Sequence, residues 1–479
     1  MSENKKSVQE DLYSYDEEFR DTIATVDSEG KRVWVYPKKP KGRYYNARNI
    51  VTIILLILFF GAPFIKINGN PFLLINIFDR EFYVLGQAFW PQDFFLLALI
   101  LIIFFVFIIL FTTAFGRLWC GWACPQTIFM EMVFRKIEYW IDGDANKQRK
   151  LAKQKWNSEK IFKRGLKYGI FLIISILIAH TAMAYLVGIE TVEKLVTSPP
   201  TENWSGFLGL VFFTGTFYWV FTYFREQACT VVCPYGRLQG VLLDKDSIVV
   251  AYDWVRGEPR GKLKRGQVQE DKGDCIDCKL CVHVCPTGID IRNGTQLECV
   301  NCTACIDACD EVMTKIGKPK GLIRYASFNS IKDGVKKLIT PRRIAYTGVL
   351  GVLLILFSFL LFTRSDISLT IQKKPGFTYQ KEDETGLYIN LFDVQLTNKT
   401  QRTQRIELKV IDNPNALLSV GDSKDMILEP AERYEGSLLL KFDDKDLSET
   451  KTPVKIGVYN EKGDLIDSEK VNFLGPIKY

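Results

Sequence analysis

Apolar residues along this chain are gathered into long stretches, with charged and polar segments between them. A helix needs about 20 residues to cross the hydrocarbon core of a bilayer. The stretches that reach or approach this length are residues 50–65, 94–115, 169–189, 206–224 and 344–363. The first is the shortest and carries Pro63 near its end. The pattern predicts an α-helical membrane region with about five transmembrane helices.

A different pattern fills residues 364–479, where short runs alternate apolar and polar side chains. Examples are LYINLFDVQL, QRIELKV, GSLLLKF and VKIGVY, with NKTQ and NEKGD as turns between runs. Such alternation in several short runs is typical of an antiparallel β-sandwich. The segment contains neither Cys nor Trp, which excludes the disulfide-and-tryptophan core of antibody domains. With no catalytic constellation in it, we expect this sandwich to serve packing or partner contact.

Charge predicts the orientation in the membrane. Residues 31–48 contain seven Lys or Arg and no acid, and residues 142–167 contain nine basic and three acidic residues. Basic flanks stay in the cytoplasm. The chain is therefore predicted to divide into a cytoplasmic segment 1–48, a membrane domain 49–228 with four spans and a cytoplasmic loop 142–167, a cytoplasmic segment 229–343, a fifth span 344–363 and an external domain 364–479. The net charge of +7 reflects this bias, so no nucleic-acid surface is expected.

All twelve cysteines lie between positions 120 and 309, in or near the predicted cytoplasmic segments. A reducing compartment disfavours structural disulfides, which makes metal or redox roles more probable for these thiols. Eight of them form two runs, CIDCKLCVHVC and CVNCTACIDAC, with the spacing C-x2-C-x2-C-x3-C. In bacterial ferredoxins the fourth cysteine of each run ligates the other run's cluster.

The sequence thus predicts two [4Fe–4S] clusters in a ferredoxin domain at about 265–320. The first would be held by Cys275, Cys278, Cys281 and Cys309, and the second by Cys299, Cys302, Cys305 and Cys285. A zinc module is the alternative for paired cysteines, but two uninterrupted ferredoxin runs argue against it. Asp310 stands where the bacterial pattern has proline, and His283 is expected to be solvent-facing or to tune a cluster.

One histidine lies within a span. A bis-histidine haem inside one chain is excluded, because His180 is the only His in a predicted transmembrane stretch. Met183 stands three residues on, so the two side chains would share a helix face as a weak soft-metal site. The alternative is a histidine that hydrogen-bonds a neighbouring helix, although ionisable residues within membranes are often functional. No nucleotide-binding fingerprint is visible.

Four further thiols stand outside the ferredoxin runs. Cys120 and Cys124 lie in WCGWACP, and Cys229 and Cys233 lie in CTVVCP, each just after a span. The two motifs indicate a parallel repeat of two membrane hairpins. At i and i+4 each pair would share a helix face, and the two pairs could converge on one four-thiolate site. Thiolates favour Cu(I), Zn or iron–sulfur clusters. The alternative is that these four cysteines are small, inert residues at helix contacts.

Taken together, these residues resemble the cytochrome c oxidase accessory protein family (FixG/RdxA-like, also called CcoG). The resemblance rests on TVDSEGKRVWVYPKKPKGRYYNARN, FWPQDFF, both Cys-x3-Cys-Pro motifs, VVAYDWVRGEPRG, CVHVCPTGIDIRNG and CIDACDEVMTKIGKPKGLIRY. It spans nearly the whole chain, and Asp310 fits the family's pattern. The Cys-x3-Cys-Pro repeat alone is shared with membrane ferredoxins of nitrate- and nitrous-oxide-reductase systems.

The resemblance implies a multi-pass protein of the bacterial inner membrane, with a periplasmic, immunoglobulin-like C-terminal domain. It implies a role in assembling cbb3-type cytochrome c oxidase. The protein would reduce Cu(II) to Cu(I), with Cys120, Cys124, Cys229 and Cys233 as copper or relay thiols. Its partners would be oxidase subunits, copper-delivery proteins and an unidentified electron donor. Two alternatives stay open: an electron-transfer subunit that links a quinol or soluble donor to a periplasmic reductase, and a non-catalytic assembly scaffold.

Overall fold

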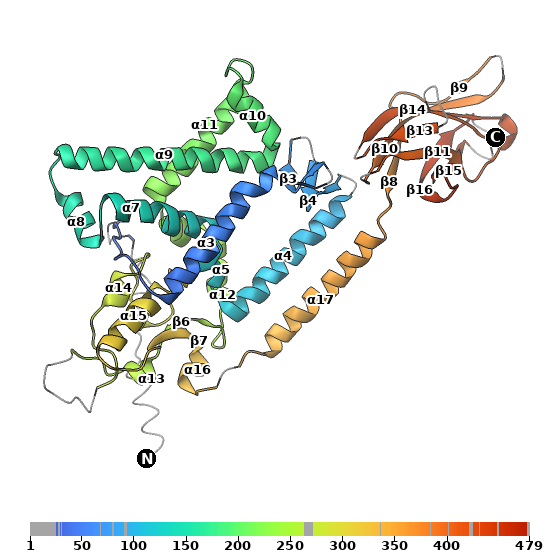
Figure 1. Ribbon diagram of the computed structural model, residues 1–479. Coiled ribbons are helices and arrows are strands. Elements are labelled where there is room, and N and C mark those ends of the chain that lie inside the picture. The colour runs from blue at the N-terminus through green and yellow to red at the C-terminus, as the bar shows by residue number, and fades with distance from the viewer. Residues whose placement is uncertain are drawn as a thin grey trace. The chain divides into compact units, whose positions relative to one another are not determined.

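The computed structural model describes most of the chain, in segments 25–26, 29, 31–67, 69–78, 81–90, 93–262, 272–335, 337–383, 385–400, 402–420, 425–430, 432–447 and 450–476. Residues 1–24 of the predicted N-terminal segment lie outside the described residues. The chain divides into two compact units (Figure 1). The first comprises residues 1–64 and 101–353, and the second comprises residues 65–100 and 354–479.

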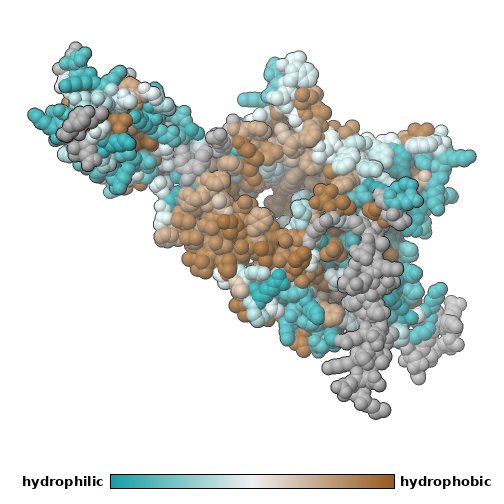
Figure 2. Space-filling model, turned by 180° about the vertical axis from the view of Figure 1, so that it is seen from behind, coloured by the Kyte–Doolittle hydropathy of each residue, from teal (hydrophilic) through white to brown (hydrophobic). Residues whose placement is uncertain are grey.

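Among the described residues, five helices are long and apolar enough to cross a membrane, which confirms the predicted helical membrane region. They are α3 (Arg43–Gly61), α4 (Phe94–Phe115), α9 (Ser158–Val187), α11 (Trp204–Trp219) with its π-helical extension η4 (Val220–Phe224), and α17 (Pro341–Phe362). Apolar side chains such as Phe104, which is 52% exposed, coat their outer faces, and Figure 2 shows the resulting apolar surface.

Two of these helices begin earlier than the hydrophobic pattern predicts. α3 begins at Arg43, and α9 begins at Ser158, where the Asn157 side chain accepts a hydrogen bond from Lys160 N. Such N-caps satisfy free backbone donors and let polar residues extend a helix beyond its apolar stretch. The basic segment 142–167 is therefore largely helical, because α8 (Ala145–Lys153) precedes α9.

Short elements connect the long helices of the first unit. They are η1 (Ala62–Phe64), α5 (Leu118–Trp122), α6 (Pro125–Thr127), the π-helical η3 (Ile128–Phe134), α7 (Arg135–Ile141), α10 (Ile189–Thr197), the π-helical η5 (Ala228–Val232), α12 (Pro234–Leu242), α13 (Trp254–Gly257) and α16 (Phe328–Lys332). An aromatic core joins the two membrane hairpins. Phe134 stacks on Phe221 at 4.5 Å and meets Phe171 edge-on at 4.7 Å.

The cysteine runs fold around a small sheet and two helices. β6 (Val249–Tyr252) pairs antiparallel with β7 (Ile323–Ala326), and the runs lead into α14 (Leu280–His283), η6 (Ile291–Asn293) and α15 (Ala304–Lys315). Val250, Ile306 and Met313 are buried here in one core together with Cys275 and Cys281. The strands thus bury much of the cysteine loops, although Cys278 is exposed.

The second unit contains a β-sandwich, which confirms the predicted all-β C-terminal fold. One sheet has the order β12-β14-β10-β8, with β9 beside β10, and the other has the order β13-β11-β15-β16. The strands are β8 (Ile367–Lys373), β9 (Gln380–Lys381), β10 (Tyr388–Asn398), β11 (Gln404–Val410), β12 (Leu417–Val420), β13 (Asp425–Leu428), β14 (Arg433–Phe442), β15 (Lys451–Asn460) and β16 (Leu465–Leu474), with the 3-10 turn η7 (Asp444–Asp446). Their alternate apolar residues form a single buried core.

The loop after α3 also folds into strands, which the sequence did not predict. They are β1 (Lys66–Ile67), β2 (Asn70–Pro71), β3 (Leu73–Asn76), β4 (Glu81–Val84) and β5 (Gln87–Phe89). At the end of this loop Asp93 is 1% exposed. Its carboxylate binds Arg364 at 2.6 Å and Lys399 at 2.7 Å, which ties the loop to the C-terminal part of the second unit.

Candidate iron–sulfur and thiol sites

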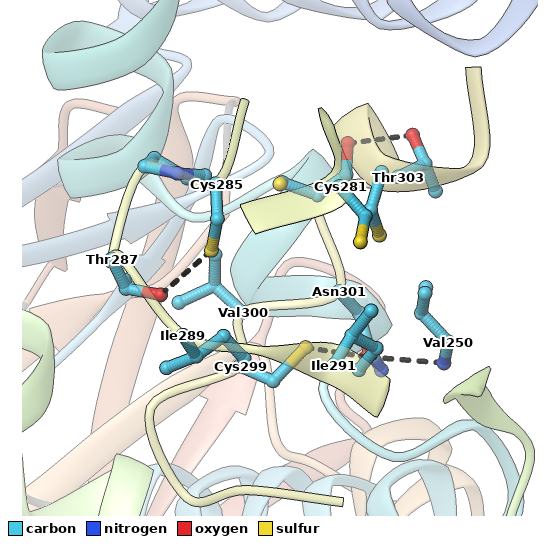
Figure 3. Close-up of a pocket in the computed structure, with 13 residues that line it drawn as sticks. Val250, Cys281, Cys285, Thr287, Ile289, Ile291, Cys299, Val300, Asn301 and Thr303 are labelled. Carbon is cyan, nitrogen blue, oxygen red and sulfur yellow. Dashed lines mark hydrogen bonds between the residues drawn. The ribbon is translucent and has the colours of Figure 1, made fainter. Parts of the chain in front are cut away.

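Eight cysteines line two adjoining pockets in the first unit. One pocket is lined by Cys281, Cys285, Cys299, Cys302 and Cys305, and the other by Cys275, Cys278, Cys281 and Cys309. Each pocket therefore gathers the four thiols assigned above to one cluster, three from one run and one from the other, and Cys281 borders both. Figure 3 shows Cys285 and Cys299 on separate segments, within 3.3 Å of Thr287 Oγ1 and 3.5 Å of Asn301 Oδ1.

Both runs follow the same backbone path. Asp277 and Lys279 have φ values of 50° and 56°, and Asn301 and Thr303 have values of 53° and 66°. In each run these residues stand two positions after the first cysteine and one after the second. Residues other than glycine rarely adopt positive φ, and its repeated use curls the backbone so that its N–H groups face one point. The two loops are thus built alike to surround a group.

The surroundings of the sulfurs fit iron. Burial raises the pKa of the Cys299 thiol to about 12 and that of Cys302 to about 11. Burial also raises the pKa of Cys285, although the backbone N–H groups of Thr287, Gly288 and Ile289 donate to its sulfur and oppose this shift. Buried thiolates require a nearby positive charge, and N–H···S bonds of this kind surround iron–sulfur clusters. The donor sets therefore fit one [4Fe–4S] cluster each.

The four remaining thiols do not lie on continuous helices, so the predicted shared helix faces are wrong. α5 ends at Trp122, and Cys124 is extended (φ −64°, ψ 124°) before Pro125 opens α6. Cys233 is likewise extended (φ −64°, ψ 110°) before Pro234 opens α12. A residue that precedes proline is disfavoured in helical conformation, which places the break at the second cysteine of each pair.

The repeat itself extends beyond the cysteines. Gly116 and Arg225 each stand four residues before the first cysteine of their motif, with φ values of 55° and 51°. Each therefore ends a span with the same sharp turn. Arginine is unusual in this conformation, and Arg225 is fixed there by ion pairs with Glu138 and Glu226.

The structure brings the two pairs together. Burial raises the pKa of Cys120 to about 12, and Cys124 and Cys233 raise it further. Burial also raises the pKa of Cys229 to about 12, with smaller contributions from the other three thiols. The four thiols are therefore within electrostatic range of one another. Within the described residues, no three His, Cys, Asp or Glu side chains converge as for a single metal ion.

Polar side chains accompany these thiols. The Cys120 thiol donates to Gln239 Oε1 at 3.3 Å. Gln239 is fully buried, and its Nε2 has no hydrogen-bond partner in the part of the chain that the structure describes. The cation of Arg117 lowers the pKa of Cys120 and also that of Cys299, so it acts on both thiol groups. A buried donor without a partner is costly unless a water or ligand meets it.

The first motif packs directly on the pocket of Cys302 and Cys305. Cys120 lies against a buried cluster that includes Val300, Cys302 and Ala304. The neighbouring Gly121 approaches so closely that an added Cβ would lie 2.5 Å from Val300 O and 2.7 Å from Asn301 O. The pocket of Cys285, Cys299, Cys302 and Cys305 is therefore the one that adjoins the membrane thiols.

Two polar residues hold this contact, and the sequence did not point to either. Arg48 of α3 is 4% exposed and donates to Gly121 O at 3.0 Å and to Cys302 O at 3.1 Å. Asp307 accepts hydrogen bonds from Tyr44 N at 3.1 Å and Tyr45 N at 2.8 Å at the start of α3. The only signal for Asp307 is its position inside the cysteine run. Arg48 could have been noticed as a charge at the edge of an apolar stretch.

Among the described residues, His180 belongs to no group of three or more His, Cys, Asp or Glu side chains that could hold a metal ion. His180 Nδ1 lies 2.7 Å from Ile176 O of its own helix, rather than from a neighbouring helix. Met183 is buried in an apolar cluster with Val192 and Leu210. His283 is exposed, and Asp310 Oδ1 accepts a hydrogen bond from Gly321 N at 2.8 Å. Asp310 thus shapes the turn after the second run.

Comparison with known proteins identifies the relatives. Models described as "4Fe-4S dicluster domain", "4Fe-4S binding domain" and "IG-like fold at C-terminal of FixG" match residues 224–328, 97–148 and 357–476. Protein RdxB of Cereibacter sphaeroides is 34% identical over 84% of this chain and 87% of its own length. Nitrogen fixation protein FixG of Rhizobium meliloti is 32% identical over 81% of each chain. The chain belongs to the FixG/RdxA family.

As a member of the FixG/RdxA family, the chain is a membrane-embedded iron–sulfur electron-transfer protein. The two matches to 4Fe-4S models cover all twelve cysteines, including Cys120 and Cys124. The crystal structure of a FixG-related protein from Vibrio parahaemolyticus aligns with 23% of this chain at 17% identity and a TM-score of 0.20.

Proposed function

We propose that this FixG/RdxA-family protein reduces Cu(II) to Cu(I) during assembly of a cbb3-type cytochrome c oxidase. Cys275, Cys278, Cys281 and Cys309 hold one [4Fe–4S] cluster, and Cys299, Cys302, Cys305 and Cys285 hold the other. When bound, the clusters supply one-electron transfer. Copper is the substrate: each Cu(II) takes up one electron and leaves as Cu(I), for oxidase subunits or copper-delivery proteins to receive.

The contact of Cys120 with the Cys302 pocket carries this proposal. Electron transfer needs donor and acceptor groups held close together in a fixed geometry. Arg48 and Gly121 supply that geometry, because they lock the first thiol motif onto the loop that carries Cys302. An inert role for the thiols would leave this close and polar contact without a purpose.

The thiols themselves suit a copper ion in transit. Cys120, Cys124, Cys229 and Cys233 are soft ligands, which prefer Cu(I) over Cu(II) and so favour the reduced ion. The unpartnered Nε2 of Gln239 is a donor available to whatever occupies this space.

Orientation follows the distribution of basic residues. The cysteine pockets pack on the starting turns of α3, beside the basic segment 31–48. Because basic flanks stay in the cytoplasm, we place the clusters on the cytoplasmic side of the bacterial inner membrane and the C-terminal sandwich in the periplasm. Copper reduced at the thiols would then serve a membrane oxidase.

Anaerobic purification with EPR during Cu(II) titration tests the proposal. Reduced protein should consume the Cu(II) signal, and the Cys229→Ser/Cys233→Ser variant should lose most of this rate. Cys229 and Cys233 are replaced first, because Cys120 packs against the Cys302 pocket and its replacement would also alter that packing. The variant should still pass electrons to a generic one-electron acceptor at the wild-type rate, which shows that its clusters are intact.

Two results would contradict the proposal. If wild-type protein with intact clusters cannot reduce Cu(II), then the protein is not a cupric reductase. Full Cu(II) reduction by a variant with all four motif cysteines replaced would make the thiols inert. Iron analysis of the same preparation adds a check, because two clusters give about eight iron atoms per chain, whereas about twelve would place a further cluster at these thiols.

A further inference from the structure

A second polar cavity opens in the first unit, away from the cysteines. It has a volume of about 290 Å³ and is lined by the N-terminal segment, α7, α8, the first turns of α9 and the end of η4. In Figure 1, α8 lies beside the first turns of α9. Ile161 and Phe162, which follow in α9, are 59% and 70% exposed, as expected for side chains that face lipid. The cavity therefore lies where an apolar span meets the membrane surface.

The cavity carries an excess of positive charge. Two of its lining residues, Glu138 and Asp142, are acidic. Four are basic: Lys160, Arg164, Lys167 and Arg225. Both carboxylates are already paired. Lys167 Nζ lies 2.7 Å from Asp142 Oδ2, and Arg225 binds Glu138. Burial opposes ionisation of Glu138, but Arg225 and Lys167 outweigh it and lower its pKa to about 2.

Two of the cations have no carboxylate partner. Lys160 is 8% exposed and donates to two carbonyls, Ala152 O at 3.1 Å and Gln154 O at 2.5 Å. Arg164 is half-buried, and no hydrogen bond or ion pair joins it to another described residue. The buried Nε of Arg225 likewise has no hydrogen-bond partner in the described chain. Burying cations without counter-charge is costly, so an anion from outside the chain would stabilise this arrangement.

The remaining lining residues define the kind of anion. Trp34, Tyr36, Trp156 and Tyr168 surround the cations, and Trp156 is 73% exposed beside Lys160. Tryptophan and tyrosine gather at the level of lipid headgroups. Basic pockets between transmembrane helices on the cytoplasmic side bind acidic headgroups, and guanidinium groups pair well with phosphate oxygens.

We propose that this cavity binds a phosphate group, supplied by the headgroup of an anionic phospholipid. Arg164 and Lys160 contact the phosphate, and the aromatic rim receives the glycerol region. The site is independent of copper reduction, so either proposal can fail without the other. The bound headgroup would fix the first turns of α9 and the N-terminal segment against the membrane surface.

Native mass spectrometry of the full-length, cluster-loaded protein in neutral detergent tests the site. Phosphatidylglycerol should bind, and phosphatidylcholine should not. Arg164→Gln should weaken phosphatidylglycerol binding about 10- to 100-fold, the range expected for hydrogen bonds to a charged group. Lys163→Gln is the matched control, because Lys163 lies on the same turn but pairs with Glu159 at 2.6 Å. Lys163→Gln should weaken phosphatidylglycerol binding by about fivefold or less, as expected for the loss of one charge at the membrane surface.

Other outcomes would overturn the proposal. Equal losses in Arg164→Gln and Lys163→Gln would show general surface attraction rather than a site. Binding of inorganic phosphate that depends on Arg164, without binding of phosphatidylglycerol, would identify a soluble ligand instead. Arg164→Lys keeps the charge but not the planar guanidinium, so it should bind more weakly than wild type and more tightly than Arg164→Gln. If Arg164→Gln binds phosphatidylglycerol as tightly as wild type while the cluster absorbance is unchanged, phosphate recognition at this position is wrong.

Discussion

Gly121→Ala is the sharpest test of how the thiol motif meets the cluster loop. The backbone of Gly121 does not have positive φ, and the residue lies within α5, so alanine suits its conformation. Helix propensity alone would make the change stabilising by up to about 1 kcal/mol. The structure predicts the opposite, because the new Cβ would lie 2.5 Å from Val300 O and 2.7 Å from Asn301 O.

The two carbonyls are backbone atoms and cannot rotate away. Relief requires the loop before Cys302 to separate from α5, which would also stretch the hydrogen bonds of Arg48 to Gly121 O and Cys302 O. Overpacking of this kind costs about 1–3 kcal/mol. A change of 1 kcal/mol shifts the thermal midpoint of a domain of 150–250 residues by about 2–4 °C. The expected drop is therefore several degrees.

The assay follows the thermal loss of the iron–sulfur absorbance, together with the rate at which a thiol reagent labels Cys120. Gly121→Ala should lower the midpoint and speed the labelling. Gly209→Ala is the control, because an added Cβ there meets nothing within 4 Å. If Gly121→Ala is as stable as Gly209→Ala and its Cys120 is labelled at the wild-type rate, then the close contact between α5 and the cluster loop is not present.

Three further sets of substitutions probe other parts of the molecule. Cys309→Ser and Cys285→Ser should each halve the iron content, to about four atoms per chain, with different EPR signals remaining, because the two cysteines line different pockets. Glu138→Gln should destabilise by about 3–5 kcal/mol, because it removes the nearest carboxylate from the buried Arg225 and one of the two carboxylates that pair with the buried Lys167. Since the folded pKa of Glu138 is lowered to about 2, its contribution is complete above its ordinary value. The gap to wild type should therefore stay constant from about pH 8 to 5 and shrink as the pH falls below about 4.5; a gap that shrinks between pH 8 and 5 would contradict this. Asp93→Ala should lower the stability of the second unit by a similar amount and so make it more sensitive to proteolysis. The control is Asp393→Ala, which breaks an exposed ion pair and should have little effect.

Much of the fold could be predicted from local patterns. Long apolar stretches predicted all five membrane helices, and alternating runs predicted strands β10, β11, β14 and β15. β16 was missed because its sequence, LIDSEKVNFL, places charges where alternation would be read. The strands of the loop 66–93 were missed as well, since their pairing depends on contacts between short segments rather than on any strong local pattern.

The candidate site, too, could be predicted from the sequence only in part. Spacing was enough to group the eight ferredoxin cysteines as the pockets have them, because ligand spacing is local. It was misleading for Cys120 and Cys124, because the proline that follows Cys124 disfavours helical conformation at that cysteine. The lock formed by Arg48 and Asp307 joins residues more than 250 positions apart. Such pairing leaves no trace in the pattern of a single sequence.

The hydrogen bond from Arg48 to Cys302 has a consequence for how the protein is made. The two residues are 254 positions apart, and ribosomes add about 5–20 residues per second. Arg48 therefore enters the membrane surface roughly 13–50 s before its partner is synthesised. During that interval the first helix carries an arginine without its final acceptors, and the dock for the cluster loop already stands in place. Docking of the cluster loop is therefore a late step, which can follow only after the first helix and the residues up to Cys302 have been made.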